Sequence, residues 1–170
     1  MKKVAFVLTL FLAVAFSASV NAQKTVVDVA VGNENFSTLV TALKAADLVT
    51  ALQGDGPFTV FAPTNDAFAK IDAETLNSLL EEKNQKALAN ILTYHVVAGN
   101  LTATDVVAAL KKGNGKVELT ALNGQVLTVM SKDDKIWLQD VNGNYSEITA
   151  TDIKGSNGVI HVIDTVVMPK

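Results

Sequence analysis

One stretch of the sequence carries most of the information on the fold: Thr59-Val60-Phe61-Ala62-Pro63-Thr64-Asn65-Asp66-Ala67-Phe68. Its first residues, with Phe58, are rich in β-branched and aromatic side chains, which predicts a buried strand over 58–62 that Pro63 ends. Thr64 then has the residue type and position of a helix N-cap, and Asp66 falls in the first turn of a short helix through Phe68. The stretch therefore predicts a strand that leads directly into a helix.

Residues on both sides of this stretch have the periodicity of helices. Apolar residues recur at the spacing of one buried helical stripe at Phe36, Leu39, Val40 and Leu43. A turn at 54–57 then breaks that helix. Two further helices are marked by Leu76, Leu79 and Leu80 and by Leu88, Ile91 and Leu92. Thr102 and Asp105 have the spacing of a capping box, which predicts a fourth short helix.

The chain after Lys111 has the alternation that is typical of strands. Asn123-Gly124 separates apolar runs at 117–121 and 125–130, and Asn142-Gly143 separates runs at 136–140 and 145–150 in the same way. Asn-Gly in this setting indicates a β-hairpin. Residues 159–168 are apolar on both faces, so we expect a final strand near the middle of a sheet. Helices in one half and strands in the other predict an α+β fold with one shared core.

The first 22 residues are typical of a secretory signal peptide. A basic start at Lys2-Lys3 precedes an apolar run from Val4 to Phe16, and small residues follow up to Ala22. The apolar run is short for a membrane anchor, which needs about 20 residues. No cysteine follows that could carry a lipid. We expect cleavage near Ala22-Gln23, a single domain over 23–170, and a secreted or periplasmic protein with no membrane insertion after cleavage.

Composition narrows the possible functions of the mature chain. Removing residues 1–22 takes away two of the 14 lysines and none of the 17 acidic residues, so the mature net charge is −5. Since the sequence also lacks arginine, no basic surface for nucleic acid is expected. The absence of cysteine excludes disulfides, thiol chemistry and cysteine-ligated metals. A chain of this length can bury a core of its own, and we expect a monomer.

The two histidines, His95 and His161, are the first candidates for catalytic or metal-binding groups. His95 extends the stripe of Leu88, Ile91 and Leu92, which places it on the core side of its helix. His161 lies within an apolar strand, so a hydrogen-bonded structural role is favoured for both. Two histidines without ligand spacing do not form a zinc site. A calcium loop starting at Asp140 fails because Tyr145 and Thr151 occupy its glycine and glutamate positions. No catalytic residue, metal or cofactor is expected.

Three blocks of sequence together resemble the fasciclin domain family. They are residues 59–68, Leu92-Thr93-Tyr94-His95-Val96-Val97, and Asn157-Gly158-Val159-Ile160-His161-Val162-Ile163-Asp164 with Met168-Pro169 after it. Their order and spacing fit the family over nearly all of 24–169. The resemblance implies a fasciclin-like wedge of two short β-sheets packed beside a cluster of short helices. It also implies a non-enzymatic role in adhesion at a cell surface, with a protein or polysaccharide as partner.

The resemblance further implies four binding residues. In animal members a Tyr-His segment and a nearby Asp-Ile segment have been linked to integrin recognition, and Tyr94-His95 and Asp152-Ile153 occupy these positions here. If Asp152 is exposed, Asp152→Ala should change stability by no more than about 0.5 kcal/mol. The short signal and the lack of disulfides suit a bacterial protein. Two other functions stay open: a carrier of a small apolar ligand or glycan held between helices and sheets, and a hydrolase that uses His95 or His161.

Overall fold

The computed structural model describes residues 23–170, which fold as a mixture of helices and strands and confirm the α+β prediction. The predicted signal peptide, residues 1–22, lies outside the described residues. The helices are α1 (Val26–Val31), η1 (Glu34–Phe36), α2 (Ser37–Ala45), α3 (Val49–Leu52), α4 (Asn65–Ala69), α5 (Ala73–Leu79), η2 (Glu82–Asn84), α6 (Gln85–Tyr94) and α7 (Ala103–Lys112). The strands are β1 (Phe58–Pro63), β2 (Val96–Ala98), β3 (Lys116–Thr120), β4 (Val126–Lys132), β5 (Lys135–Gln139), β6 (Tyr145–Gly155) and β7 (Gly158–Ile163).

The strands follow the order β2-β1-β7-β6-β5-β4-β3. β1 pairs in parallel with β7, and the other pairs are antiparallel. β6 pairs with β5 through its first residues and with β7 through the rest, and two register shifts at Ile148–Ile153 bend it between the two halves. Such irregularities bend a strand and raise its twist. An isolated bridge from Val97 to Ala121 joins β2 to the chain just after β3. This arrangement is the expected wedge of two sheets.

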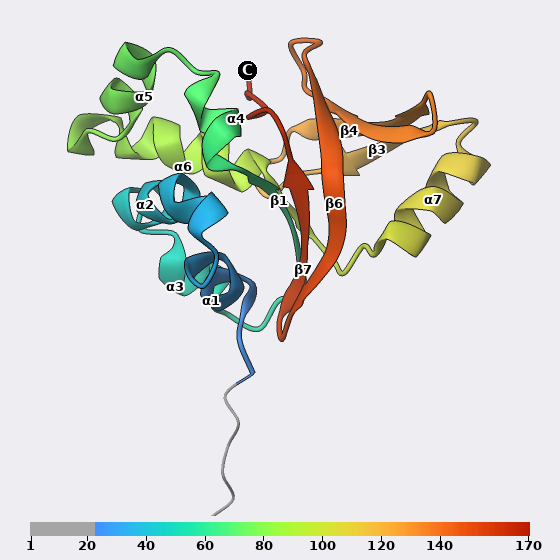
Figure 1. The fold of residues 1–170 in the computed structure, drawn as a ribbon, viewed down its shortest axis with the longest axis horizontal. Helices are drawn as coiled ribbons and strands as arrows, with labels where there is room; N and C mark the ends of the chain where they lie inside the picture. Colours follow the sequence, from blue (N-terminus) through green and yellow to red (C-terminus); the bar gives the residue numbers. More distant parts are fainter. Residues whose placement is uncertain (1–22) are drawn as a thin grey trace, which may run out of the picture.

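The helices cover the wedge unequally. Figure 1 shows α1 to α6 gathered on one side of β1 and β7, while α7 lies beyond β6 on the other side. β1 and β7 are therefore buried on both faces, as the position in mid-sheet predicts for β7. Alternate residues of β1 point to opposite faces: Val60 and Ala62 pack among the helices, whereas Phe61 packs toward α7.

Two apolar clusters result, and we call them the helical core and the sheet core. The helical core lies between α1–α6 and one face of β1 and β7, and it includes Phe36, Leu39, Leu92 and Ile160. The sheet core lies between α7 and the strands, and it includes Tyr94, Leu110, Leu127, Leu138 and Ile163. The single shared core that the sequence predicted is thus divided in two by β1 and β7.

The local signals for turns and caps are confirmed. Thr64 caps α4 by accepting from the N–H of Ala67, and Thr102 with Asp105 forms the capping box of α7. Gly143 has a φ of 87°, which suits the hairpin turn between β5 and β6. Several boundaries differ from the prediction. The helix expected to run up to the turn at 54–57 ends at Ala45, and a separate α3 follows it. The last strand ends at Ile163 rather than Met168, and the strand predicted over 145–150 continues to Gly155.

Candidate functional site

Tyr94, the first of the four implied binding residues, lies at the C-terminal end of α6 and is fully buried. Its hydroxyl group donates to the carbonyl oxygen of Val126 (2.8 Å) and accepts from the N–H of Val141 (3.1 Å). Burial raises the pKa of Tyr94 against a smaller opposing effect of the Val141 bond, so the phenol remains a donor. Tyr94 therefore fastens α6 to the start of β4 and to the turn after β5.

His95 is the C-cap residue of α6 and is only 2% exposed. Its Nε2 lies 3.2 Å from the backbone nitrogen of Val167, and its Nδ1 lies 2.8 Å from the carbonyl oxygen of Ile91. Because a backbone N–H only donates, Nε2 accepts and the ring proton is on Nδ1. Burial lowers the pKa of His95 to about 4, although the bond to Ile91 acts in the other direction. The predicted core position of His95 is confirmed, and the ring is neutral at neutral pH.

Asp152 and Ile153 lie on β6 at the second register shift, and both are partly buried. Asp152 has a φ of 60°, and its Oδ1 accepts from the N–H of Ala103 (2.8 Å), the first residue of α7. Ile153 pairs with Ile160 of β7 and packs against the helical core. The condition under which Asp152→Ala would be nearly neutral is therefore not met: Asp152 is partly buried, and its carboxylate supports the N-terminus of α7.

His161 completes the connection around Asp152. Its Nε2 lies 2.7 Å from the carbonyl oxygen of Leu101 and so donates, while its Nδ1 accepts from the N–H of Asp152 at 3.4 Å. The ring is 1% exposed, and its centroid lies 5.7 Å from that of Phe61. The N–H of Phe61 in turn donates to the carbonyl oxygen of His95 (2.8 Å). Within the described residues no hydrogen bond joins Tyr94-His95 directly to Asp152-Ile153.

Asp140 is a structural residue whose role the sequence did not reveal. It is buried, and its Oδ1 accepts from the N–H groups of Asn142 and Asn144, both at 2.9 Å. Its Oδ2 accepts from the side chain of Asn144 and from the N–H of Met168. The carboxylate thus closes the turn between β5 and β6 and holds the C-terminal segment. Among residues 23–170 no three His, Asp or Glu side chains cluster as metal ligands.

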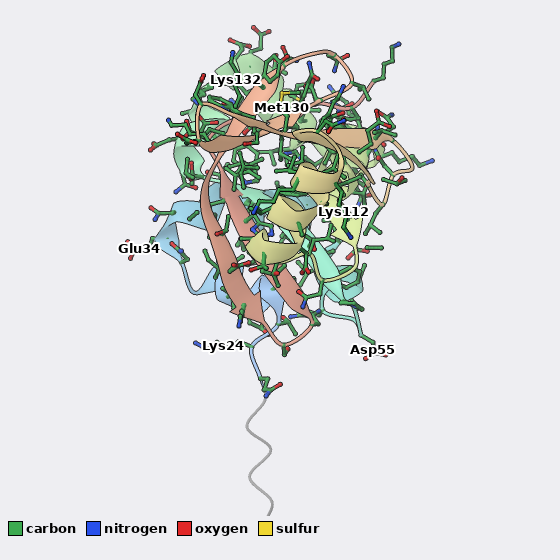
Figure 2. All side chains as sticks on the ribbon, turned by 90° about the vertical axis from the view of Figure 1, so that its right-hand side faces the viewer. Lys24, Glu34, Asp55, Lys112, Met130 and Lys132 are labelled. Atoms are coloured by element: carbon green, nitrogen blue, oxygen red, sulfur yellow. The ribbon has the colours of Figure 1, made fainter. Side chains whose placement is uncertain are left out.

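The surface of residues 23–170 has a hollow lined by large aromatic side chains. Its volume is about 300 Å³, and it is lined by Met130, Lys132, Asp133, Trp137 and Tyr145. These residues come from β4, the following turn, β5 and the start of β6. Figure 2 shows Met130 and Lys132 at the end of the molecule opposite Lys24 and Asp55. We call this feature the aromatic hollow. Its lining could not be predicted from the sequence, because the register of the three strands decides which side chains face one another.

The interior offers little room for a small molecule. The apolar space between α1, α2 and the sheet, next to Val27 and Leu39, has a volume of about 10 Å³. The crevice beside His161 and Val106 has none that water could enter. A drug-sized ligand needs at least about 300 Å³. Between residues 23 and 170 no helix is both long and apolar enough to span a bilayer.

The chain is similar to a known domain family and to several known proteins. The fasciclin domain family matches residues 34–169. The chain is 49% identical over 157 residues to Protein sll1483 of Synechocystis sp., covering 92% of this chain and 80% of that protein. It is 39% identical to transforming growth factor-beta-induced protein ig-h3 of Sus scrofa over 145 residues, which is 85% of this chain but only 19% of that protein.

A bacterial surface protein and a solved structure are also similar. The chain is 35% identical to the cell surface glycolipoprotein MPB83 of Mycobacterium bovis, covering 87% of this chain and 62% of that protein. A solved FAS1 domain pair from the insect cell adhesion molecule Fasciclin I matches with a TM-score of 0.73. That match covers 84% of this chain and 50% of the other at 20% identity, and it shows a common fold.

Proposed function

The chain belongs to the fasciclin domain family, and on this premise we propose that it is a non-enzymatic adhesion domain that binds a protein or polysaccharide at a cell surface. The family is associated with adhesion and with cell-surface proteins. The proposal includes a monomeric chain and a secreted or periplasmic location. Cleavage near Ala22-Gln23 by a bacterial signal peptidase fits the order of basic, apolar and small residues in 1–22.

The observation that carries the proposal is that both histidines serve the fold, through hydrogen bonds to the backbone. Both ring nitrogens of His95 and of His161 are already engaged with backbone groups. A general base needs a nitrogen within hydrogen-bond reach of the proton that it removes. Neither ring has such a nitrogen free, and within the described residues neither is hydrogen-bonded to a hydroxyl that could act as nucleophile. This argues against the hydrolase, and the small interior spaces argue against the carrier.

The four binding residues that the resemblance implies have different roles in the proposal. Asp152 and Ile153 keep part of their surface open to solvent, so a partner can contact them without rearrangement. Tyr94 and His95 are buried, so they act by holding the backbone that other residues present. Recognition through this region therefore depends on Asp152 and Ile153 for contact, whereas Tyr94 and His95 contribute through the stability of the fold.

The test is a binding experiment with the mature chain, residues 23–170. The immobilised chain is exposed to separate protein and polysaccharide fractions from the surface of the producing cells. We expect saturable retention of one partner, which heat-unfolded chain does not reproduce. Asp152→Asn keeps an oxygen acceptor for Ala103 but removes the charge, so reduced retention with unchanged melting would support contact by Asp152. Absence of saturable retention, or substrate turnover that His161→Gln abolishes, would contradict the proposal.

A further inference from the structure

The largest side chain of the protein contributes to neither core. Trp137 is the single tryptophan of the sequence, and it is missing from both apolar clusters. Its neighbour Leu138 is fully buried in the sheet core, so strand alternation turns Trp137 to the outer face of β5. There it lies opposite Met130 of β4 and Glu147 of β6. Together with Met130 and Tyr145 it lines the aromatic hollow, and apolar side chains gathered in a surface hollow with a few polar groups are typical of a ligand site.

The aromatic hollow combines this apolar floor with polar groups of both kinds. Lys132 only donates and Asp133 only accepts, and within the described residues neither forms an ion pair. The hydroxyl group of Tyr145 accepts from Nε2 of Gln139 (2.9 Å), which leaves its own proton free to donate. The two charges cancel within the lining. A neutral ligand with many hydroxyl groups, each both donor and acceptor, fits this set better than an ion of either sign.

The indole N–H of Trp137 gives a second, independent indication. Its Nε1 is the buried side-chain polar atom that has no hydrogen-bond partner in residues 23–170. An unpaired buried donor is unfavourable, and such atoms in a native protein point to a missing partner. A small movement of the ring that presents Nε1 to a ligand oxygen would remove this cost.

We propose that the aromatic hollow binds pyranose units of a neutral polysaccharide. The apolar C–H face of a sugar ring stacks on Trp137 and Tyr145, and its hydroxyl groups bond to Lys132, Asp133 and the indole N–H. This inference rests on the proposed adhesion function: it names one class of partner and a further surface, separate from Asp152 and Ile153, that receives it. The volume of about 300 Å³ suits one or two sugar rings.

Two other occupants fit less well. An acidic polysaccharide would bring its carboxylates beside Asp133 in a domain that already has a net charge of −5 after removal of residues 1–22. A protein partner would need roughly 800 Å² on each side for a stable interface. The hollow is too small to provide that by itself, so a peptide would have to extend over charged side chains such as Lys135 and Glu147, which are already paired with each other.

Trp137 makes the test direct, since a single tryptophan reports on this surface alone. The mature chain is titrated with neutral gluco-, manno- and galacto-pentasaccharides while tryptophan emission is recorded. We expect a saturable change with at least one of them. Trp137→Ala, followed by calorimetry, should weaken that binding by about tenfold or more, as for other aromatic anchors. Trp137→Phe keeps a stacking ring and should weaken it less.

Controls separate binding from folding. Leu122→Ala removes another exposed apolar side chain outside the hollow and should leave affinity unchanged. Tyr145→Ala, at a side chain that is 51% exposed, should fold normally and still lose affinity. The inference is overturned if no neutral pentasaccharide changes the emission up to about 10 mM, or if Trp137→Ala and Tyr145→Ala bind like the parent. Binding restricted to uronic-acid oligosaccharides or to peptides overturns it as well.

Failure of this inference is distinguishable from failure of the adhesion function. If the Trp137→Ala chain still retains a partner from surface fractions while the pentasaccharides do not bind the parent, the domain is adhesive through another surface. If the parent retains nothing from any fraction, the adhesion function itself fails.

Discussion

The backbone N–H groups of Val167 and Met168 donate to side chains instead of to a neighbouring strand. Nε2 of His95 accepts from Val167, and Oδ2 of Asp140 accepts from Met168. The carbonyl oxygen of Thr165 accepts in the same way from the hydroxyl group of Ser146 (2.8 Å). Asp164 still donates to the carbonyl oxygen of Glu147 in β6 (3.1 Å), but the bonds from side chains satisfy the segment after it without sheet pairing. The apolar residues Val166, Val167 and Met168 therefore have the composition of a strand, although side chains and not a neighbouring strand accept from Val167 and Met168.

His95→Ala should destabilise the domain by about 3 kcal/mol, since a cavity and unpaired groups on Ile91 and Val167 add together. Denaturant unfolding of the variant and the parent measures this difference. A binding assay on the folded fraction should show no separate loss. If His95→Ala unfolds like the parent but loses its partner, then Tyr94-His95 is a recognition site and not a structural one.

The same histidine makes stability depend on pH. Its pKa falls from 6.5 to about 4 in the folded protein because of burial, so the unfolded chain binds the proton more readily. The free energy of unfolding that neutral His95 contributes is therefore fully present above pH 6.5. It is lost as the pH falls toward 4, by about 3 kcal/mol in all. Unfolding of the parent and of His95→Gln is compared at several values from pH 7 to 4.5. The parent should lose more stability than the variant, and equal losses would contradict this.

At the scale of elements, one carboxylate joins the bend of β6 to the start of α7. Oδ1 of Asp152 accepts from Ala103, while the capping box of Thr102 and Asp105 serves the same helix end. The first N–H groups of a helix have no partner inside the helix. Asp152 supplies one from β6, 49 residues away in sequence. The β6 bend and α7 are therefore mutually stabilising.

Asp152→Ala should cost about 1–2 kcal/mol, because it removes a helix-capping acceptor and places alanine at a positive φ. Asp152→Asn keeps both an acceptor oxygen and a residue that tolerates this conformation, so it should cost far less. Thermal or denaturant melting of the two variants provides the comparison. Equal stability of parent and Asp152→Ala would mean that α7 does not depend on this bond.

The elements with local signals were predictable, and those determined by tertiary packing were not. The hairpin around Gly143 and the cap at Thr64 follow from residue type alone. Helix α1, with four valines among its six residues, has a composition typical of strands. It is helical because Thr25 and Asp28 form a capping box and its apolar face is buried. The β4–β5 turn, with Asp133 and Asp134 both at positive φ, lacks the Asn-Gly pair that signals the other two hairpins.

The candidate sites differ in the same way: what local spacing determines was predictable, and what strand register determines was not. Burial of His95 was predictable from helical spacing, since Leu88 and Leu92 lie on the same face. The aromatic hollow was not, because it depends on the pairing of Met130 with Trp137 across two strands. The available signal was a lone tryptophan between Ile136 and Leu138, of which Leu138 is fully buried. Alternation then places Trp137 outside, but only the observed register shows which side chains surround it.

At the scale of the whole chain, the export proposal predicts the mature N-terminus. The small residues that end at Ala22 should direct cleavage before Gln23. Mass spectrometry of the protein from the periplasm or medium should therefore find a chain that starts at Gln23. Replacing Ala22 by a bulky residue should slow this processing. An exported chain that retains Met1 would contradict the cleavage site.

The two cores should unfold together, because β1 and β7 form a wall of both and β6 runs through both halves of the sheet. Leu39→Ala, in the helical core, should cost about 3 kcal/mol. With a typical denaturant dependence, this lowers the urea midpoint by about 1–2 M. Trp137 is on β5, which is separated from β1 and β7 by β6 in the strand order. Its emission therefore reports on the half of the sheet that is remote from the helical core.

Emission of Trp137 and far-ultraviolet circular dichroism should shift by the same amount in Leu39→Ala, as a two-state transition requires. Val126→Ala, at an exposed position on β4, is the matched control and should leave both midpoints in place. A Trp137 transition that stays at the parent's midpoint while the helical signal is lost earlier would mean that β1 and β7 do not couple the cores. The helical half would then be a separate unit on the sheet wedge.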